Sequence, residues 1–94
     1  MTGPARQPPY EIQFDAKAAK LLRKLDRHVQ SRLVVAIAAL GLDPRPQGVK
    51  ALTGHPGLLR IRVGDYRVVY RIDDGKLIVL VVQLGHRSDI YDLL

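Results

Sequence analysis

Four arginines flank a Gly64-Asp65 pair at spacings that could bring their side chains together. Alternate residues of a strand point to the same face of a sheet, and a Gly-Asp pair between two such runs is typical of a two-residue hairpin turn. In that register Arg62 lies opposite Arg67, and one face, called here the arginine face, carries Arg60, Arg62, Arg67 and Arg71. Because planar guanidinium groups bind pairs of phosphate oxygens, this face predicts contact with a polyanion.

A row of arginines is also compatible with an ordinary solvated sheet surface. However, like charges directly opposite one another on neighbouring strands repel, at a cost of up to about 1 kcal/mol. The expected pairing of Arg62 with Arg67 therefore brings no benefit to stability. A bound polyanion would relieve the repulsion, which favours a binding surface.

The next segment of this expected meander adds apolar side chains to the arginine face. A second two-residue turn, at Asp74-Gly75, would place Ile78, Leu80 and Val82 beside the arginines. A central strand is often covered on both faces by its own domain. Since few residues follow this strand, we instead expect a partner to cover these three side chains.

Three residues that could take part in proton transfer or phosphate binding follow: His86, Arg87 and Tyr91. Continued alternation would place His86 on the arginine face, and Arg87 would reach it only if the chain turned at Gly85. An ordinary histidine titrates near pH 6.5, whereas a tyrosine must have its pKa of about 10 lowered by cations before it can accept protons at neutral pH. His86 fits a purely structural role at a bend equally well.

The composition limits the class of protein. The 94 residues carry 15 Lys and Arg against 9 Asp and Glu, a net charge of +6, which favours nucleic acid or an acidic protein as partner. There is no cysteine and the three histidines are scattered, so we expect no disulfide, thiol catalysis, metal site or other cofactor. The N-terminus is polar and Pro-rich, and the longest apolar run, Leu77 to Val82, is too short to span a bilayer. These features predict a cytoplasmic protein.

The remaining patterns predict one α+β domain over residues 10–94, preceded by a flexible tail over residues 1–9. Tyr10 to Phe14 alternates as a strand, and a helical hairpin follows, in which Asp15 is the expected N-cap of the first helix and the second helix begins near Asp26. Asp43 to Gly57 is expected to be a loop before the three-stranded antiparallel meander. The helices are expected on the sheet face opposite the arginines, with Tyr66 and Tyr70 in the core.

Two stretches resemble the RelE toxin family: LLRIRVGDYRVVY at residues 58–70 and GHRSDIY at residues 85–91. Residues 24–26 and 43–46 look like family sequence too, so the resemblance covers nearly everything after Tyr10. It implies the toxin of a bacterial type II toxin-antitoxin pair, which enters the ribosomal A site and cleaves mRNA there. It also implies that Arg67 and Arg87 bind phosphate and that Tyr91 is an active-site residue.

The sequence departs from some members of this family at three positions. Those relatives have lysine where this chain has Arg60, Arg62 and His86. Because a guanidinium group keeps its proton, Arg60 and Arg62 can hold and polarise a phosphate but are poor proton acceptors. The choice of general base therefore stays open between His86 and Tyr91.

The implied reaction uses the RNA's own 2′-hydroxyl as nucleophile and gives a 2′,3′-cyclic phosphate and a 5′-hydroxyl. It requires a base, an acid and cations that stabilise the transition state, and the last role would fall to Arg60, Arg62, Arg67 and Arg87. The expected partners are the ribosome with its mRNA and a cognate antitoxin, laid along Ile78, Leu80 and Val82 as an amphipathic or extended segment.

Two other functions fit the same residues in part. A ParE-like toxin has the same fold but inhibits DNA gyrase without catalysis, and fold alone does not separate the two. A simple nucleic-acid-binding module would have the charge but would leave the Gly-His-Arg motif and Tyr91 unexplained. The presence of Arg67, Arg87 and Tyr91 favours the nuclease.

Overall fold

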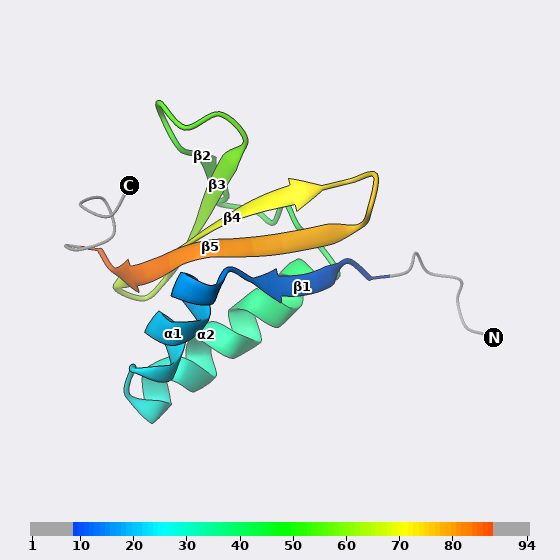
Figure 1. Ribbon diagram of the computed structural model, residues 1–94. Coiled ribbons are helices and arrows are strands. Elements are labelled where there is room, and N and C mark those ends of the chain that lie inside the picture. The colour runs from blue at the N-terminus through cyan, green and yellow to red at the C-terminus, as the bar shows by residue number, and fades with distance from the viewer. Residues whose placement is uncertain (1–8, 88–94) are drawn as a thin grey trace.

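The computed structural model describes residues 9–87, which form two helices and one five-stranded sheet (Figure 1). In chain order the elements are β1 (Glu11–Phe14), α1 (Ala16–Arg23), α2 (Arg27–Leu40), β2 (Lys50–Ala51), β3 (Leu58–Val63), β4 (Tyr66–Asp73) and β5 (Ile78–His86). The strand order across the sheet is β1-β5-β4-β3-β2, and both helices cover the same face. The predicted α+β class is confirmed. Apart from Pro9, the predicted tail lies outside the described residues.

The two helices form where the apolar periodicity predicts them. Asp26 caps α2, its carboxylate accepting a hydrogen bond from the backbone N–H of His28 at 3.2 Å. Asp15 precedes α1, but its side chain makes no capping bond; its backbone N–H instead donates to Val81 O at 2.9 Å and extends the pairing of β1 with β5. The apolar stripes of both helices pack on the sheet. The helices thus leave the arginine face uncovered.

Local turn chemistry fixes the hairpin of β3 and β4. Gly64 has a φ of 63°, a left-handed conformation that glycine adopts without strain. The pairs Arg62–Arg67 and Val63–Tyr66 flank the turn, as the two-residue hairpin requires. The predicted register of this hairpin is confirmed.

The predicted register of β4 with β5 is wrong. Gly75 does not adopt positive φ, and the left-handed residue of this connection is Leu77, with a φ of 56°. The Asp73 side chain accepts a hydrogen bond from Lys76 N at 3.0 Å, and Asp73 pairs with Ile78, which leaves four residues in the connection. The pair Asp74-Gly75 is therefore part of a longer loop than predicted.

A β-bulge further along β5 adds a one-residue shift to the two-residue shift made by this loop. Tyr70 pairs with Val81 but Val69 pairs with Gln83, so that Val82 is the extra residue on β5. An extra residue of this kind reverses the inside-outside alternation of the rest of the strand. Every β5 side chain after the bulge therefore lies on the opposite face from the one that simple alternation predicts.

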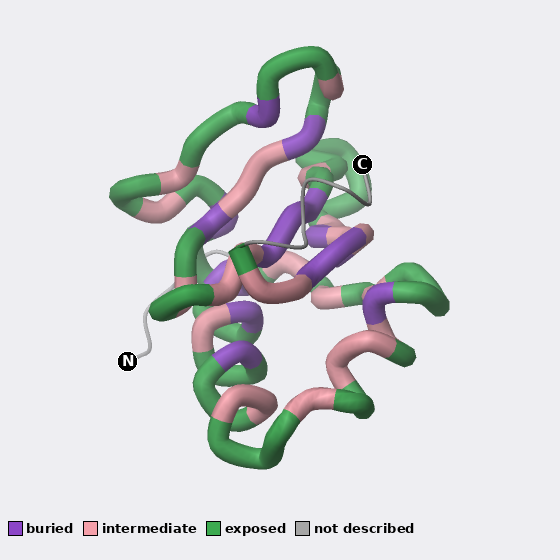
Figure 2. Tube along the Cα trace, turned by 90° about the vertical axis from the view of Figure 1, so that its left-hand side faces the viewer, coloured by how far each residue is buried: buried purple, intermediate pink, exposed green. Residues whose placement is uncertain are grey.

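Two short strands complete the sheet at its edges. At one edge β1 runs parallel to β5, with Gln13 aligned with Leu80. At the other, β2 pairs with β3 in a stretch predicted to be loop, and aligns Lys50 with Arg60. The connection from β2 to β3 is mostly exposed, whereas the buried stretches gather where the sheet meets the helices (Figure 2).

The main core lies between the helices and β3, β4 and β5. Its largest buried side chain is Tyr70, which is fully inaccessible to solvent and donates a 2.6 Å hydrogen bond to Pro44 O. Tyr70 and the half-buried Tyr66 are thus core residues, as predicted. Within residues 9–87, neither helix is long and apolar enough to cross a membrane.

Candidate nucleic-acid interface

The arginine face is formed by the pairing of β3 with β4. Arg62 lies directly opposite Arg67, and Arg60 lies opposite Val69 on the same face. The edge strand β2 adds Lys50 beside Arg60, a residue that the sequence patterns did not reveal because only two residues form that strand. Strand alternation and register thus bring cationic side chains from three adjacent strands onto one surface.

These cations lack acidic partners within residues 9–87. In that part of the chain the one ion pair is Arg45–Asp74, at the other end of β4, with an N–O distance of 2.9 Å. Arg62 and Arg71 are exposed, whereas Arg60 and Arg67 are half-buried. No ion pair within residues 9–87 neutralises the positive charge of the face.

Arg67 differs from the other arginines of the face in the environment of its guanidinium group. Its Nε and Nη1 atoms are buried and have no hydrogen-bond partner among the described residues. A buried donor without a partner costs about 1–3 kcal/mol, and such groups are rare in folded proteins. The residue directly opposite Arg67 on β5 is Gly85, which has no side chain to serve as acceptor. Arg67 thus has two buried donor nitrogens without an acceptor in this part of the chain.

The β5 bulge brings Gln83, a second residue with an unpaired buried donor, to the arginine face. Gln83 pairs with Val69, so the two side chains lie on the same face. Only 2% of Gln83 is exposed, and its Nε2 atom is also buried without a partner among the described residues. Strict alternation along β5 would place Gln83 on the helix face, and the sequence contains no signal for the bulge.

The same bulge moves His86 away from the arginine face, so the prediction from alternation is wrong. His86 pairs with Tyr66, a residue of the helix face. The two rings are in edge-to-face contact, with centroids 5.5 Å apart and an interplanar angle of 84°. This packing favours the structural role of His86.

Arg87 continues the pairing beyond β5. Its backbone N–H donates to Asp65 O at 2.8 Å, and its side chain is exposed. Alternation from Gly85 through His86 places Arg87 on the same face as Arg67. The predicted turn at Gly85 is not needed, because the bulge already shifts the alternation. Tyr91 lies outside the described residues.

The three apolar residues predicted to meet a partner differ in how far the domain itself covers them. Val82 packs against a small cluster formed by Leu52, Leu58 and Val69. The expectation that too little chain remains to cover this strand was wrong for Val82, because Leu52 comes from the segment after β2. Ile78 and Leu80 are half-buried, next to β1 at the sheet edge.

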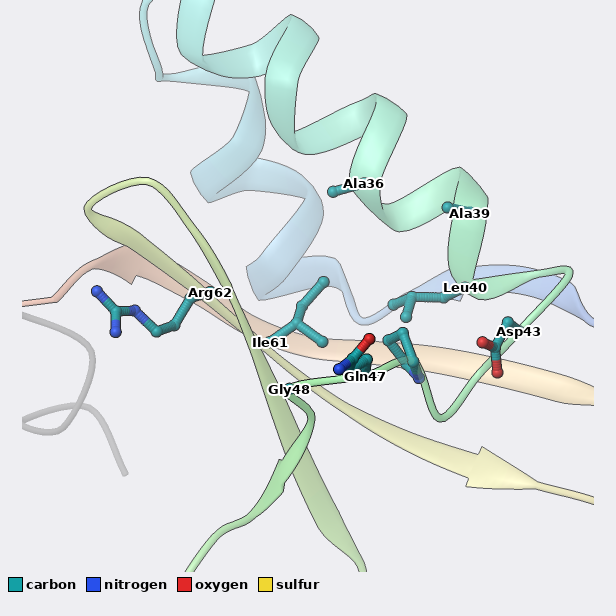
Figure 3. Close-up of a pocket in the computed structure, with 9 residues that line it drawn as sticks. Ala36, Ala39, Leu40, Asp43, Gln47, Gly48, Ile61 and Arg62 are labelled. Carbon is teal, nitrogen blue, oxygen red and sulfur yellow. The ribbon is translucent and has the colours of Figure 1, made fainter.

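One pocket among the described residues lies away from the arginine face. It has a volume of about 450 Å³ and lies between α2, the loop after it and β3, lined by residues including Ala36, Leu40 and Ile61 (Figure 3). Arg62 reaches its rim, but the guanidinium group points away from the other lining residues. Within residues 9–87, no three His, Cys, Asp or Glu side chains gather closely enough to hold a metal ion.

The titratable groups with clearly shifted pKa values serve the fold. Burial raises the pKa of Tyr70 to about 12. A hydrogen bond from Arg45, together with one from the Tyr10 hydroxyl, lowers the pKa of the exposed Asp74 carboxylate. These contacts tie β1 and the loop after α2 to the β4–β5 connection, at the opposite end of β4 from Arg67.

Residues 12–91 match the family described as the ParE toxin of the type II toxin-antitoxin system parDE. Toxin RelG of Mycobacterium tuberculosis is 33% identical over 84 residues, 88% of this chain and 97% of that protein. The mRNA interferase toxin RelE of Escherichia coli K12 is 34% identical over 86 residues, 87% of this chain and 90% of that protein. The chain belongs to the RelE/ParE superfamily of type II toxin-antitoxin toxins.

Solved structures of relatives have the same fold. The toxin-antitoxin complex RelBE2 of M. tuberculosis contains a chain that superposes with a TM-score of 0.76 at 31% identity, covering 89% of this chain and 98% of that one. A chain of the intact E. coli RelBE complex gives a TM-score of 0.73 at 32% identity, covering 82% and 95% respectively.

The arginine face of this RelE-family toxin has the chemistry of a phosphate-binding surface. Fixed guanidinium groups can neutralise the charge that develops on a phosphate as it becomes five-coordinate. Arginine does not release its proton near neutral pH. The described part of the face therefore has the chemistry to bind and neutralise a phosphate, but its arginines are poor proton acceptors.

Proposed function

We propose that this toxin is a metal-independent endoribonuclease that cleaves mRNA on the ribosome in the cytoplasm and so inhibits translation. The observation that carries the proposal is Arg67, whose buried Nε and Nη1 atoms have no partner in the part of the chain that is described. Its neighbours on the face are cationic and lack acidic partners there. The mRNA interferase name of the E. coli relative agrees with this chemistry.

In the proposed reaction the 2′-oxygen of a ribose attacks the adjacent phosphorus, and the bond from phosphorus to the 5′-oxygen breaks. The proton of the 2′-hydroxyl goes to a base, and the leaving 5′-oxygen receives a proton from an acid. Arg67 stabilises the transition state, assisted by Arg60, Arg62 and Arg87 around it. No metal-activated water is needed, because the RNA supplies the nucleophile.

The position of His86 changes the order of the candidates for proton transfer. His86 lies against Tyr66 on the helix face, whereas the phosphate would lie on the arginine face. We therefore propose Tyr91 as the first candidate for the base, a role that requires cations to lower the pKa that a tyrosine ordinarily has. His86 then acts by holding Tyr66 at the end of the hairpin.

Dependence on the ribosome follows from what the arginine face lacks. Single-stranded RNA is flexible, and its 2′-oxygen is seldom in line with the bond that must break, so orientation is a large part of the barrier. Among the described residues, what the face offers to RNA is charge and hydrogen-bond donors. We propose that the ribosomal A site supplies the alignment.

The test is cleavage of a defined mRNA by purified toxin, with and without programmed ribosomes and with EDTA present. Cleavage only on ribosomes, insensitive to EDTA and leaving a cyclic phosphate, is the expected result. Arg67→Ala should slow the reaction about 100- to 1000-fold, as loss of one transition-state contact does. Arg23→Ala, an exposed arginine at the end of α1, is the matched control and should retain the parent rate.

The second candidate function is inhibition of DNA gyrase, and the match of residues 12–91 to the ParE toxin family favours it. It predicts no RNA cleavage with or without ribosomes, and gyrase-dependent breaks in supercoiled DNA. The two assays on one preparation decide between the candidates.

We further propose that a cognate antitoxin neutralises the toxin, as the RelBE complexes of relatives suggest. Its apolar side chains would cover Ile78 and Leu80 together with the part of Val82 left open by the domain, and its acidic side chains would meet the arginines. Leu80→Asp should weaken antitoxin binding at least about tenfold. An unchanged antitoxin affinity would show that the antitoxin contacts another part of the toxin.

A further inference from the structure

Gln83 is a buried polar residue whose side-chain nitrogen has no hydrogen-bond partner within residues 9–87. The residue is 2% exposed, and the unpaired nitrogen is Nε2. Two β5 residues that precede Gln83, Val79 and Val81, are buried in the main core, but their side chains are apolar and need no hydrogen-bond partner. A buried amide without an acceptor is a cost that folded proteins rarely retain. An acceptor from outside this part of the chain would remove that cost.

The sheet register brings Gln83 close to Arg67. Gln83 pairs with Val69, and Arg67 lies two residues before Val69 on β4, so the two side chains share one face as diagonal neighbours. Diagonal neighbours on adjacent strands are roughly 7–8 Å apart at their backbones, within reach of side chains as long as these. Because of the bulge, Val82 packs against the cluster of Leu52, Leu58 and Val69, and Gln83 lies beside Arg67.

Together the two residues present three buried nitrogen donors: Nε and Nη1 of Arg67 and Nε2 of Gln83. A ligand that satisfies them must be rich in acceptors, and the guanidinium charge favours an anion. Lys50, Arg60 and Arg62 continue the positive charge across β2 and β3. A line of cations leading to a cluster of donors matches a chain of phosphates better than a single carboxylate.

We propose that Gln83 is a further substrate-binding residue, whose amide N–H and the Arg67 guanidinium together bind one phosphate of the RNA. This inference rests on the proposed function and deepens it. Arg67 supplies charge and two donors, while Gln83 supplies a neutral donor that fixes which non-bridging oxygen faces the guanidinium. The bulge at Val82 is the backbone feature that makes this possible, since a regular β5 would place Gln83 in the helix core.

The kinetic test compares Gln83→Leu with Gln13→Leu, an exposed glutamine on β1. Single-turnover cleavage on programmed ribosomes should fall on the order of 10- to 100-fold for Gln83→Leu, the loss expected for one hydrogen bond to a charged group. Gln13→Leu should cleave at the parent rate. Gln83→Leu should be at least as resistant to thermal unfolding as the parent, because it removes an unpaired buried amide.

Gln83→Glu separates substrate binding from a structural role. A carboxylate at this position neutralises Arg67 and repels phosphate, so cleavage should fall further than in Gln83→Leu. If the glutamine instead held Arg67 through its carbonyl oxygen, Gln83→Leu would be less stable than the parent, and Gln83→Glu would restore both stability and cleavage. That result would overturn the proposal.

A direct measurement keeps the inference independent of catalysis. The side-chain NH₂ resonances of Gln83 are followed by NMR while an uncleavable all-2′-deoxy oligonucleotide is added. They should shift in the parent, and not in an Arg67→Met background. Absence of a shift in the parent, or cleavage by Gln83→Leu at the parent rate with only antitoxin affinity reduced, would refute phosphate binding by Gln83. A shift in a protein that does not cleave RNA would instead refute the proposed nuclease function alone.

Discussion

Replacing Arg67 by methionine should stabilise the free toxin while it abolishes most of the activity. Methionine keeps the apolar stem of the side chain but removes the charge. In the parent, Nε and Nη1 of Arg67 are buried without partners among the described residues, and the side chain lies opposite Arg62, a second cation. Nothing in residues 9–87 relieves the cost at this position, and a bound anion would do so.

The size of the effect follows from these contacts. Two unsatisfied donors at the low end of about 1 kcal/mol each, together with a few tenths for repulsion by Arg62, give about 2 kcal/mol in favour of the variant. For a domain of this size such a gain would raise the melting temperature by roughly 10 °C. Cleavage should fall about 100- to 1000-fold, since one transition-state contact is lost.

The assay is urea unfolding followed by circular dichroism, on the parent, Arg67→Met and Arg71→Met. Arg71 is an exposed arginine on the same strand, and its replacement should change the free energy of unfolding by no more than about 0.5 kcal/mol. If Arg67→Met were instead destabilised by about 1 kcal/mol or more, as most substitutions are, the guanidinium would have favourable partners in the free protein, and the reasoning would be refuted.

Three further predictions concern the fold. Burial raises the pKa of Tyr70 to about 12, so the contribution of its neutral hydroxyl to the free energy of unfolding is complete below pH 10 and is lost as the pH rises through 12. Measured by urea unfolding over that range, the parent should lose about 2–3 kcal/mol of stability relative to Tyr70→Phe. Gly41→Ala would put a methyl group 3.0 Å from the backbone carbonyl oxygen of Tyr10 and should lower the free energy of unfolding by about 1–3 kcal/mol. Gly75→Ala, whose nearest contact is 3.5 Å, should change it little, and equal effects of the two substitutions would contradict the packing. Because Arg45 lowers the pKa of Asp74, Asp74→Asn should slightly lower stability at pH 7 and match the parent in acid, and a difference that persisted in acid would argue against this ion pair.

The sequence determined those features that depend on neighbouring residues. The apolar period of α2 and its Asp26 cap act within a few residues, as does the Gly64 turn that sets the register of β3 and β4. Because that register is local, the meeting of Arg62 with Arg67 follows from the sequence alone.

Only the tertiary structure decided the composition of the face beyond those arginines. The bulge at Val82 lies just after the residues of β5 that pair with β1, and Val82 packs on the small cluster around Leu52. Two-residue turn chemistry and strict alternation carry no information on such nonlocal packing, and so they placed Gln83 and His86 on the wrong faces. Burial is likewise a property of the whole fold. The unpaired donors of Arg67 and Gln83 exist only because β4 and β5 assemble with the rest of the sheet.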